Sequence, residues 1–136
     1  MKSFEQYIEE QEMLQEQLTR TDIKMVEKYA DKLFAAVGVD VDLSGTHFRE
    51  RVNDTRNGND ITLVELMGLF KKTFAKHGKK IGGMKPGIEA VINDVNSDIN
   101  IPFMIKYDKR NDELDVIAKT IMRKKDYKTS NSKLRV

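Results

Sequence analysis

The chain has 136 residues, and its 24 lysines and arginines nearly balance 22 aspartates and glutamates, for a formal net charge of +2. The absence of cysteine excludes disulfides, thiol nucleophiles and cysteine-ligated zinc, and two histidines argue against a multi-histidine metal site. No apolar run is long enough for a transmembrane helix, and the first residues lack the apolar core of a secretory signal. We therefore expect one soluble intracellular domain, with no metal, no other cofactor and no membrane partner.

The charge is unevenly distributed along the chain. Residues 1–18 carry five acidic residues and one lysine, whereas residues 119–136 carry seven basic residues and one aspartate. We therefore divide the chain into an acidic amino-terminal segment 1–18, a domain 19–123 and a basic, loosely ordered tail 124–136.

Helical periodicity dominates the first part of the chain. Segment 3–19 is polar with a thin apolar stripe and is expected to be helical. Apolar residues at helical spacing predict a second helix that Thr21 caps, that runs to about Val37 and that Gly38 ends.

A short extended piece and a short helix are predicted next. Val39, Val41 and Leu43 alternate with aspartates, which is typical of a strand. A helix is then expected over residues 46–53, with Ser44 or Thr46 as its cap.

The middle of the chain contains the clearest helix start. Thr62 and Glu65 have the spacing of a capping box, and Gly78 is expected to end the helix that follows. Residues 79–87 hold three glycines and a proline and are expected to form a flexible loop. Residues 88–95 are ambiguous, and we interpret them as a short helix.

A hairpin is predicted near the carboxyl end. Apolar residues alternate over 101–107 and again over 114–122, and the polar turn 108–112 separates the two runs. The sequence therefore predicts an α+β fold, with amino-terminal helices followed by a small antiparallel sheet that ends in this hairpin.

The first ten residues contain a lysine, a small hydroxyl residue, two spaced aromatics, an aliphatic residue and a glutamate. This order resembles the capsid-targeting peptide of T-even-type phage internal head proteins. The resemblance implies a protein that enters the prohead core, where the maturation protease removes its amino-terminal peptide. The protein then passes from the virion interior into the host cytoplasm. That protease cuts after a Leu/Ile-x-Glu tripeptide, which here places Ile8 and Glu10 at the cut. The alternative is an ordinary acidic amphipathic helix.

A second cluster could carry chemistry. On a helix, His47 and Arg51 share one face, while Phe48 and Val52 share the adjacent face and can anchor it. A histidine can act as general acid or base near neutral pH, and an arginine can hold a phosphate. The pair is therefore a candidate for RNA cleavage through the 2′-hydroxyl. The alternative is that His47 is a surface residue at the start of a helix.

This His-hydrophobic-x-x-Arg pattern resembles the helix found in phage-encoded members of the barnase–EndoU–colicin–RelE superfamily of toxin nucleases. The order of the predicted elements is also similar. The resemblance implies that the last strands form the floor of an RNA cleft. It implies Thr120 as a third catalytic residue, with Lys119 or Arg123 neutralising charge.

Basic side chains suggest nucleic acid, either RNA or packaged DNA, as a partner. The candidate contacts are Arg56, Lys119, Arg123, Lys124 and Lys125. The lysines of residues 71–85 are interpreted as a solvated face, with contact to nucleic-acid phosphates as the alternative. The leading hypothesis is a virion-packaged internal protein with an RNase-like activity. The alternatives are a non-enzymatic internal protein that binds DNA or inhibits a host defence protein, and a structural or scaffold-associated phage protein.

Overall fold

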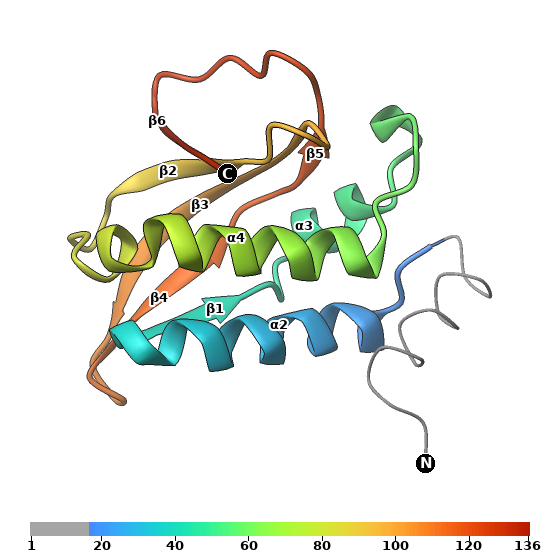
Figure 1. The fold of residues 1–136 in the computed structure, drawn as a ribbon. Coiled ribbons are helices and arrows are strands. Elements are labelled where there is room, and N and C mark those ends of the chain that lie inside the picture. The colour runs from blue at the N-terminus through green and yellow to red at the C-terminus, as the bar shows by residue number, and fades with distance from the viewer. Residues whose placement is uncertain (1–16) are drawn as a thin grey trace.

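The computed structural model describes residues 17–136 and has the predicted α+β fold (Figure 1). The segment that resembles a targeting peptide, including Ile8 and Glu10, and nearly all of the predicted helix 3–19 lie outside the described residues. In the described part, helices α2, α3 and α4 and two short 3-10 helices combine with a sheet of six strands.

The N-cap of helix α2 (Arg20–Phe34) lies two residues before the predicted cap. Thr19, and not Thr21, is the N-cap: its hydroxyl accepts a hydrogen bond from the amide of Asp22, and the Asp22 carboxylate accepts one from the Thr19 amide. This reciprocal pair satisfies two amides that the first turn leaves free. The helix passes into η1 (Ala35–Val37), and Gly38 ends it in the left-handed conformation, as expected.

Helix α3 (Thr46–Val52) occupies the predicted position, but its predicted side-chain cap is wrong. Gly45 is the N-cap and has no side chain to offer, while the Ser44 hydroxyl donates instead to Asp42, at 2.6 Å. The buried residues Phe48 and Val52 hold the helix on the core. The short 3-10 helix η2 (Thr55–Asn57) follows.

Helix α4 (Leu63–Gly82) has the predicted capping box, formed by Thr62 and Glu65. It continues through Gly78, so the predicted stop and part of the predicted loop 79–87 are wrong. A Cβ atom at Gly78 would lie 2.9 Å from the ring of Phe74. The glycine therefore makes room for Phe74, whose ring packs edge-on against Phe34 at 5.4 Å between centroids.

The sheet has the strand order β1-β4-β3-β2-β6, with β5 paired to β3. The predicted hairpin is confirmed as antiparallel β3 and β4, whereas the edge strands β1 and β6 pair in parallel with β4 and β2. The strand bounds are β1 (Val39–Asp42), β2 (Glu89–Asn93), β3 (Ile99–Asp108), β4 (Glu113–Ala118), β5 (Met122–Arg123) and β6 (Ser132–Arg135).

Two segments differ from their prediction. Residues 88–95 were expected to be helical, but β2 lies inside the sheet, and Ala90, Val91 and Ile92 are buried in succession, which removes the alternation that marks a strand. The tail 124–136 was expected to be loosely ordered, but its last residues form β6. Leu134 is buried there, and the carbonyl of Arg135 lies 2.8 Å from His77 Nε2 on α4.

Helices α2 and α4 lie side by side over one face of the sheet, and the core fills the space between these two layers (Figure 1). The free edge of β1 is covered by α2. The carboxylates of Glu27 and Asp31 accept hydrogen bonds from the amides of Leu43 and Val41, at 2.8 and 2.7 Å. Burial, followed by a hydrogen bond with Asp40, raises the pKa of Asp31 to about 7. The acids of α2 thus protect an exposed strand edge.

Candidate anion-binding pocket between α3 and β5

A pocket of about 600 Å³ lies where α3 and η2 approach the segment around β5. It brings together five of the eight predicted catalytic and nucleic-acid-binding residues. The lining residues are Arg51, Asp54, Arg56, Asn57, Thr120, Ile121, Met122, Arg123 and Lys124. Residues about seventy positions apart in the sequence therefore meet in one cavity.

Asn57 joins the two walls of this pocket. Asn57 is 7% exposed, and its side-chain nitrogen donates to the carbonyl of Arg51 at the end of α3, at 2.9 Å. Its carbonyl oxygen accepts a hydrogen bond from the backbone amide of Arg123, at 2.9 Å. Sequence reasoning missed this residue, although an asparagine before a glycine in a turn is a usable signal.

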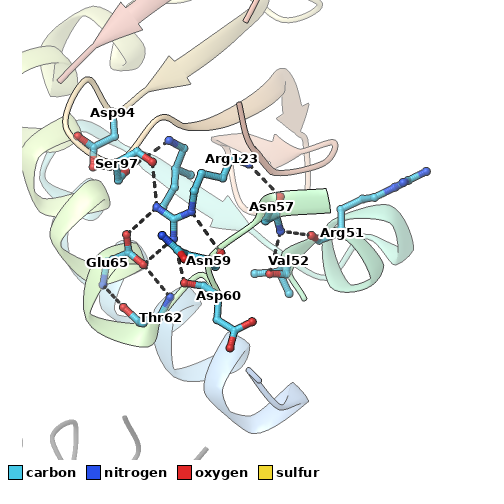
Figure 2. Close-up of polar contacts among 11 residues, drawn as sticks. Arg51, Val52, Asn57, Asn59, Asp60, Thr62, Glu65, Asp94, Ser97 and Arg123 are labelled. Atoms are coloured by element: carbon cyan, nitrogen blue, oxygen red, sulfur yellow. Dashed lines mark hydrogen bonds and ion pairs between the residues drawn. The ribbon is translucent and has the colours of Figure 1, made fainter. Parts of the chain in front are cut away.

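Arg123 is a structural residue of the pocket floor. Its guanidinium donates to both carboxylate oxygens of Glu65, at 2.9 and 3.0 Å, and to three backbone carbonyls (Figure 2). Those carbonyls belong to Asn59, Asp60 and Ser97. These five hydrogen bonds use all five guanidinium donors, and the side chain is 15% exposed. Arg123 was predicted to contact nucleic acid or to neutralise reacting charge, but its donors are already occupied within the protein.

Glu65 takes part in two structural contacts at the start of α4. It closes the capping box of α4 and pairs with Arg123. Burial raises the pKa of Glu65, but the hydrogen bonds from Arg123 and the Thr62 amide and the nearby positive charge outweigh it, so the pKa lies below its ordinary value. The carboxylate therefore stays charged and fixed, and the ion pair joins the start of α4 to β5.

Arg51 and Arg56 lie at the rim and share a single carboxylate. Asp54 accepts from Arg51 at 3.2 Å and from the Nε and Nη2 atoms of Arg56 at 2.8 to 3.2 Å. The Arg56 side chain is 70% exposed, and the Arg51 side chain extends away from the Arg123 cluster (Figure 2). Both guanidiniums keep donors free of any described partner.

Lys124 and Thr120 complete the lining on the other wall. The backbone of Lys124 is fixed, because its amide donates to the Asp98 carbonyl and its carbonyl accepts from the Asn100 side chain, both at 2.9 Å. Its side chain is exposed and has no ion pair with any carboxylate in residues 17–136. Thr120 is half-buried beside the fully buried Ile121.

Three predicted site residues do not line the pocket. The His47 side chain is 76% exposed and lies 3.9 Å from Glu50, its nearest described carboxylate. Arg51 lies four positions further along α3, which is about 6 Å along the helix axis, and only Arg51 lies at the end of α3 that reaches the pocket. Lys119 pairs with Glu89, and Lys125 is exposed outside the lining.

The pocket therefore carries an excess of positive charge. Arg123 is neutralised by Glu65, which leaves Arg51, Arg56 and Lys124 against the one carboxylate of Asp54. Arginine presents paired donors that match the oxygens of a phosphate or carboxylate, and lysine adds a point charge. Such a lining suits a bound anion. The described lining contains no histidine, and its one unoccupied hydroxyl belongs to Thr120.

No helix within residues 17–136 is both long and apolar enough to cross a membrane. Comparison with known proteins adds no further assignment, since no protein-family model, no curated protein and no solved structure matches the chain.

Proposed function

We propose that the pocket binds a phosphate group of a nucleic acid. The observation that carries this proposal is the placement of Arg51, Arg56 and Lys124 around one open cavity of about 600 Å³ with a single carboxylate, Asp54, to oppose them. A phosphodiester supplies one negative charge and two free oxygens, which matches guanidinium donors at the rim. Phosphate contacts of this kind position a nucleic acid without reading its sequence.

Binding is better supported than cleavage. Cleavage through a 2′-hydroxyl requires a general base within hydrogen-bond reach of the reacting oxygen. His47 lies outside the pocket, and Asp54 already accepts hydrogen bonds from two arginines. We therefore favour the alternative, a non-enzymatic protein that binds nucleic acid, over the leading hypothesis of an RNase-like effector.

We also propose that this protein is an internal phage head protein, on the resemblance of residues 1–10 alone. Removal of Met1 to Glu10 would delete three acids and one base, so the remaining chain would carry a net charge of +4 in place of +2. The processed form would then bind polyanions more strongly. Mass spectrometry of virions tests the proposal: a new terminus at Gln11 supports it, and an intact Met1 or absence from virions contradicts it.

The binding proposal is tested by fluorescence anisotropy with a labelled single-stranded oligonucleotide over a range of salt concentrations. The variant Arg51→Ala/Arg56→Ala removes two rim cations. Its matched control, Lys109→Ala/Arg110→Ala, removes two exposed cations at the β3–β4 turn. We expect the rim variant to bind about tenfold more weakly and its salt slope to fall by about 0.7 per lost contact. Equal losses in both variants would contradict the pocket as the binding site.

The choice between binding and cleavage needs a separate assay. Purified protein and a His47→Ala variant are each incubated with labelled RNA, and the products are separated on a denaturing gel. We expect the RNA to stay intact with both proteins. Degradation that disappears in the His47→Ala variant would restore the nuclease hypothesis.

A further inference from the structure

Helix α2 carries a stripe of four basic residues on its solvent side. Arg20, Lys24, Lys28 and Lys32 are spaced four residues apart, and all four are exposed. Residues at this spacing lie along one side of a helix. Within residues 17–136, no carboxylate forms an ion pair with any of them.

The acids of the same two helices are turned inward. On α2, Asp22 caps the helix, and Glu27 and Asp31 bind backbone amides at the edge of β1. On α4, the single acid Glu65 pairs with Arg123. The internal contacts of the fold therefore use every carboxylate of α2 and α4. The charged residues of α2 and α4 that are fully exposed are all basic, whereas their acids are buried or half-buried.

Helix α4 extends this basic surface. The two helices pack side by side on the same face of the sheet (Figure 1), so the exposed residues of both lie on this side of the sheet. The exposed lysines of α4 are Lys71, Lys76, Lys79 and Lys80. We call the exposed basic residues of both helices the basic helix face.

A cluster of carboxylates lies beside α2, where Asp40 at the β1 edge of the sheet forms a hydrogen bond with Asp31 of α2. Strand alternation places Asp40, Asp42 and Asp115 away from the buried side chains of β1 and β4. Carboxylate oxygens of Asp40, Glu113 and Asp115 come within 4.8 Å of one another. These acids therefore limit the basic surface of α2 on the side of β1.

We propose that the basic helix face binds the backbone of a nucleic-acid duplex. The α2 stripe is about 18 Å long at about 1.5 Å per helical residue, which matches the rise of about five base pairs at 3.4 Å each. Two adjacent helices provide a broad, shallow surface, whereas the pocket at α3 fits a single phosphate group. This inference is independent of the pocket, and either site can fail without the other.

An anionic membrane is a less suitable partner for this face. Helices that bind a bilayer surface combine basic residues with large apolar side chains that enter the lipid. Among the described residues of α2 and α4, Val64 at the start of α4 is the one large apolar side chain that is clearly exposed. The basic helix face thus offers charge without an apolar anchor.

The experiment compares two triple variants with the same loss of charge. Lys24→Ala/Lys28→Ala/Lys32→Ala removes most of the α2 stripe, and Lys106→Ala/Lys109→Ala/Arg110→Ala removes three exposed cations of the β3–β4 hairpin. Alanine favours helix, so the stripe variant is expected to fold, which circular dichroism checks. Binding to a labelled DNA duplex is measured by anisotropy as the salt concentration rises.

We expect the stripe variant to bind duplex at least about tenfold more weakly and to lose about 0.9 from the salt slope per lysine that contacts a phosphate. The hairpin variant should bind almost as the unchanged protein does. Equal weakening of both variants would overturn the proposal, as would stripe-dependent binding to phosphatidylserine vesicles without duplex binding. The Arg51→Ala/Arg56→Ala variant is measured in the same assay to separate the contribution of the pocket from that of the basic helix face. A loss confined to that variant would support the pocket and overturn the basic helix face.

Discussion

Arg123 and the pair Arg51 and Arg56 border the same pocket, but they stand in different environments. Arg123 is 15% exposed and directs all five donors to protein acceptors, whereas Arg51 and Arg56 are 41% and 70% exposed and share Asp54. A half-buried ion pair whose donors are all hydrogen-bonded is costly to break, while exposed pairs contribute about 0–1 kcal/mol. One residue type therefore stabilises the fold on one wall and remains available for a ligand on the other.

The largest effect is expected from removing Arg123. Arg123→Ala leaves Glu65 and three carbonyls without their donor, so the free energy of unfolding should fall by about 3–5 kcal/mol. Urea denaturation followed by circular dichroism measures this loss. Arg123→Lys should recover less than half of it, because an ammonium cannot form the paired contact. Arg56→Ala is the control and should change stability by less than about 1 kcal/mol. Equal losses of unfolding free energy in Arg123→Ala and Arg56→Ala would contradict the structural role assigned to Arg123.

A smaller effect is expected from the partner of Arg123. The pKa of Glu65 is lowered in the folded chain, so its charge stabilises the protein above the ordinary value of 4.5, and this contribution is lost as the pH falls through the lowered pKa. Glu65→Gln should be less stable by about 1.5–3 kcal/mol at neutral pH, and less dependent on pH below 4.5. Urea denaturation at several pH values checks both points. The exposed Glu50→Gln is the control, and the Glu65 assignment is wrong if both variants keep the full acid dependence.

A gain of function is expected at the rim. Asp54→Asn removes the carboxylate that opposes Arg51 and Arg56, while an asparagine can still accept the Arg56 amide that now bonds to Asp54. Removing one negative charge at a solvent-exposed rim strengthens the binding of an anion by about 1 kcal/mol. This corresponds to a roughly fivefold rise in affinity for an oligonucleotide. Anisotropy at low salt measures it. An affinity that falls in this variant would show that Asp54 supports the ligand.

The smallest effect is expected at His47. Its side chain is exposed and pairs weakly with Glu50, so His47→Ala should change the free energy of unfolding by less than about 0.5 kcal/mol. Oligonucleotide affinity should also stay the same. A tenfold loss of affinity would show that His47 contributes to binding and that the binding site extends along α3.

Local patterns predicted the parts of the fold that local contacts determine. The capping box of Thr62 and Glu65 and the β3–β4 hairpin depend on residues close in the sequence. The β2 strand pairs with the neighbouring β3, but burial at three successive positions hides its alternation, and β6 pairs with β2, which is distant in the sequence. Sequence reasoning therefore missed the internal strand β2 and the edge strand β6, whereas alternation predicted the other edge strand, β1.

The same limit explains the outcome for the candidate site. Helical spacing correctly oriented Phe48 and Val52 toward the core, and resemblance directed attention to Thr120, which lines the pocket with Arg51. The spacing of His47 and Arg51 could not show which end of α3 meets the sheet. The sequence also did not reveal that Glu65 pairs with Arg123, because these two residues are 58 positions apart.

The contacts of Arg123 also bear on the order of folding. Its side chain and backbone amide bind partners that lie between 26 and 66 positions away in the sequence. Each contact closes a long loop, and loop closure has an entropic cost that later contacts must offset. We therefore expect the Arg123 cluster to form after the folding transition state, so that it slows the opening of the finished domain and leaves its rate of formation almost unchanged.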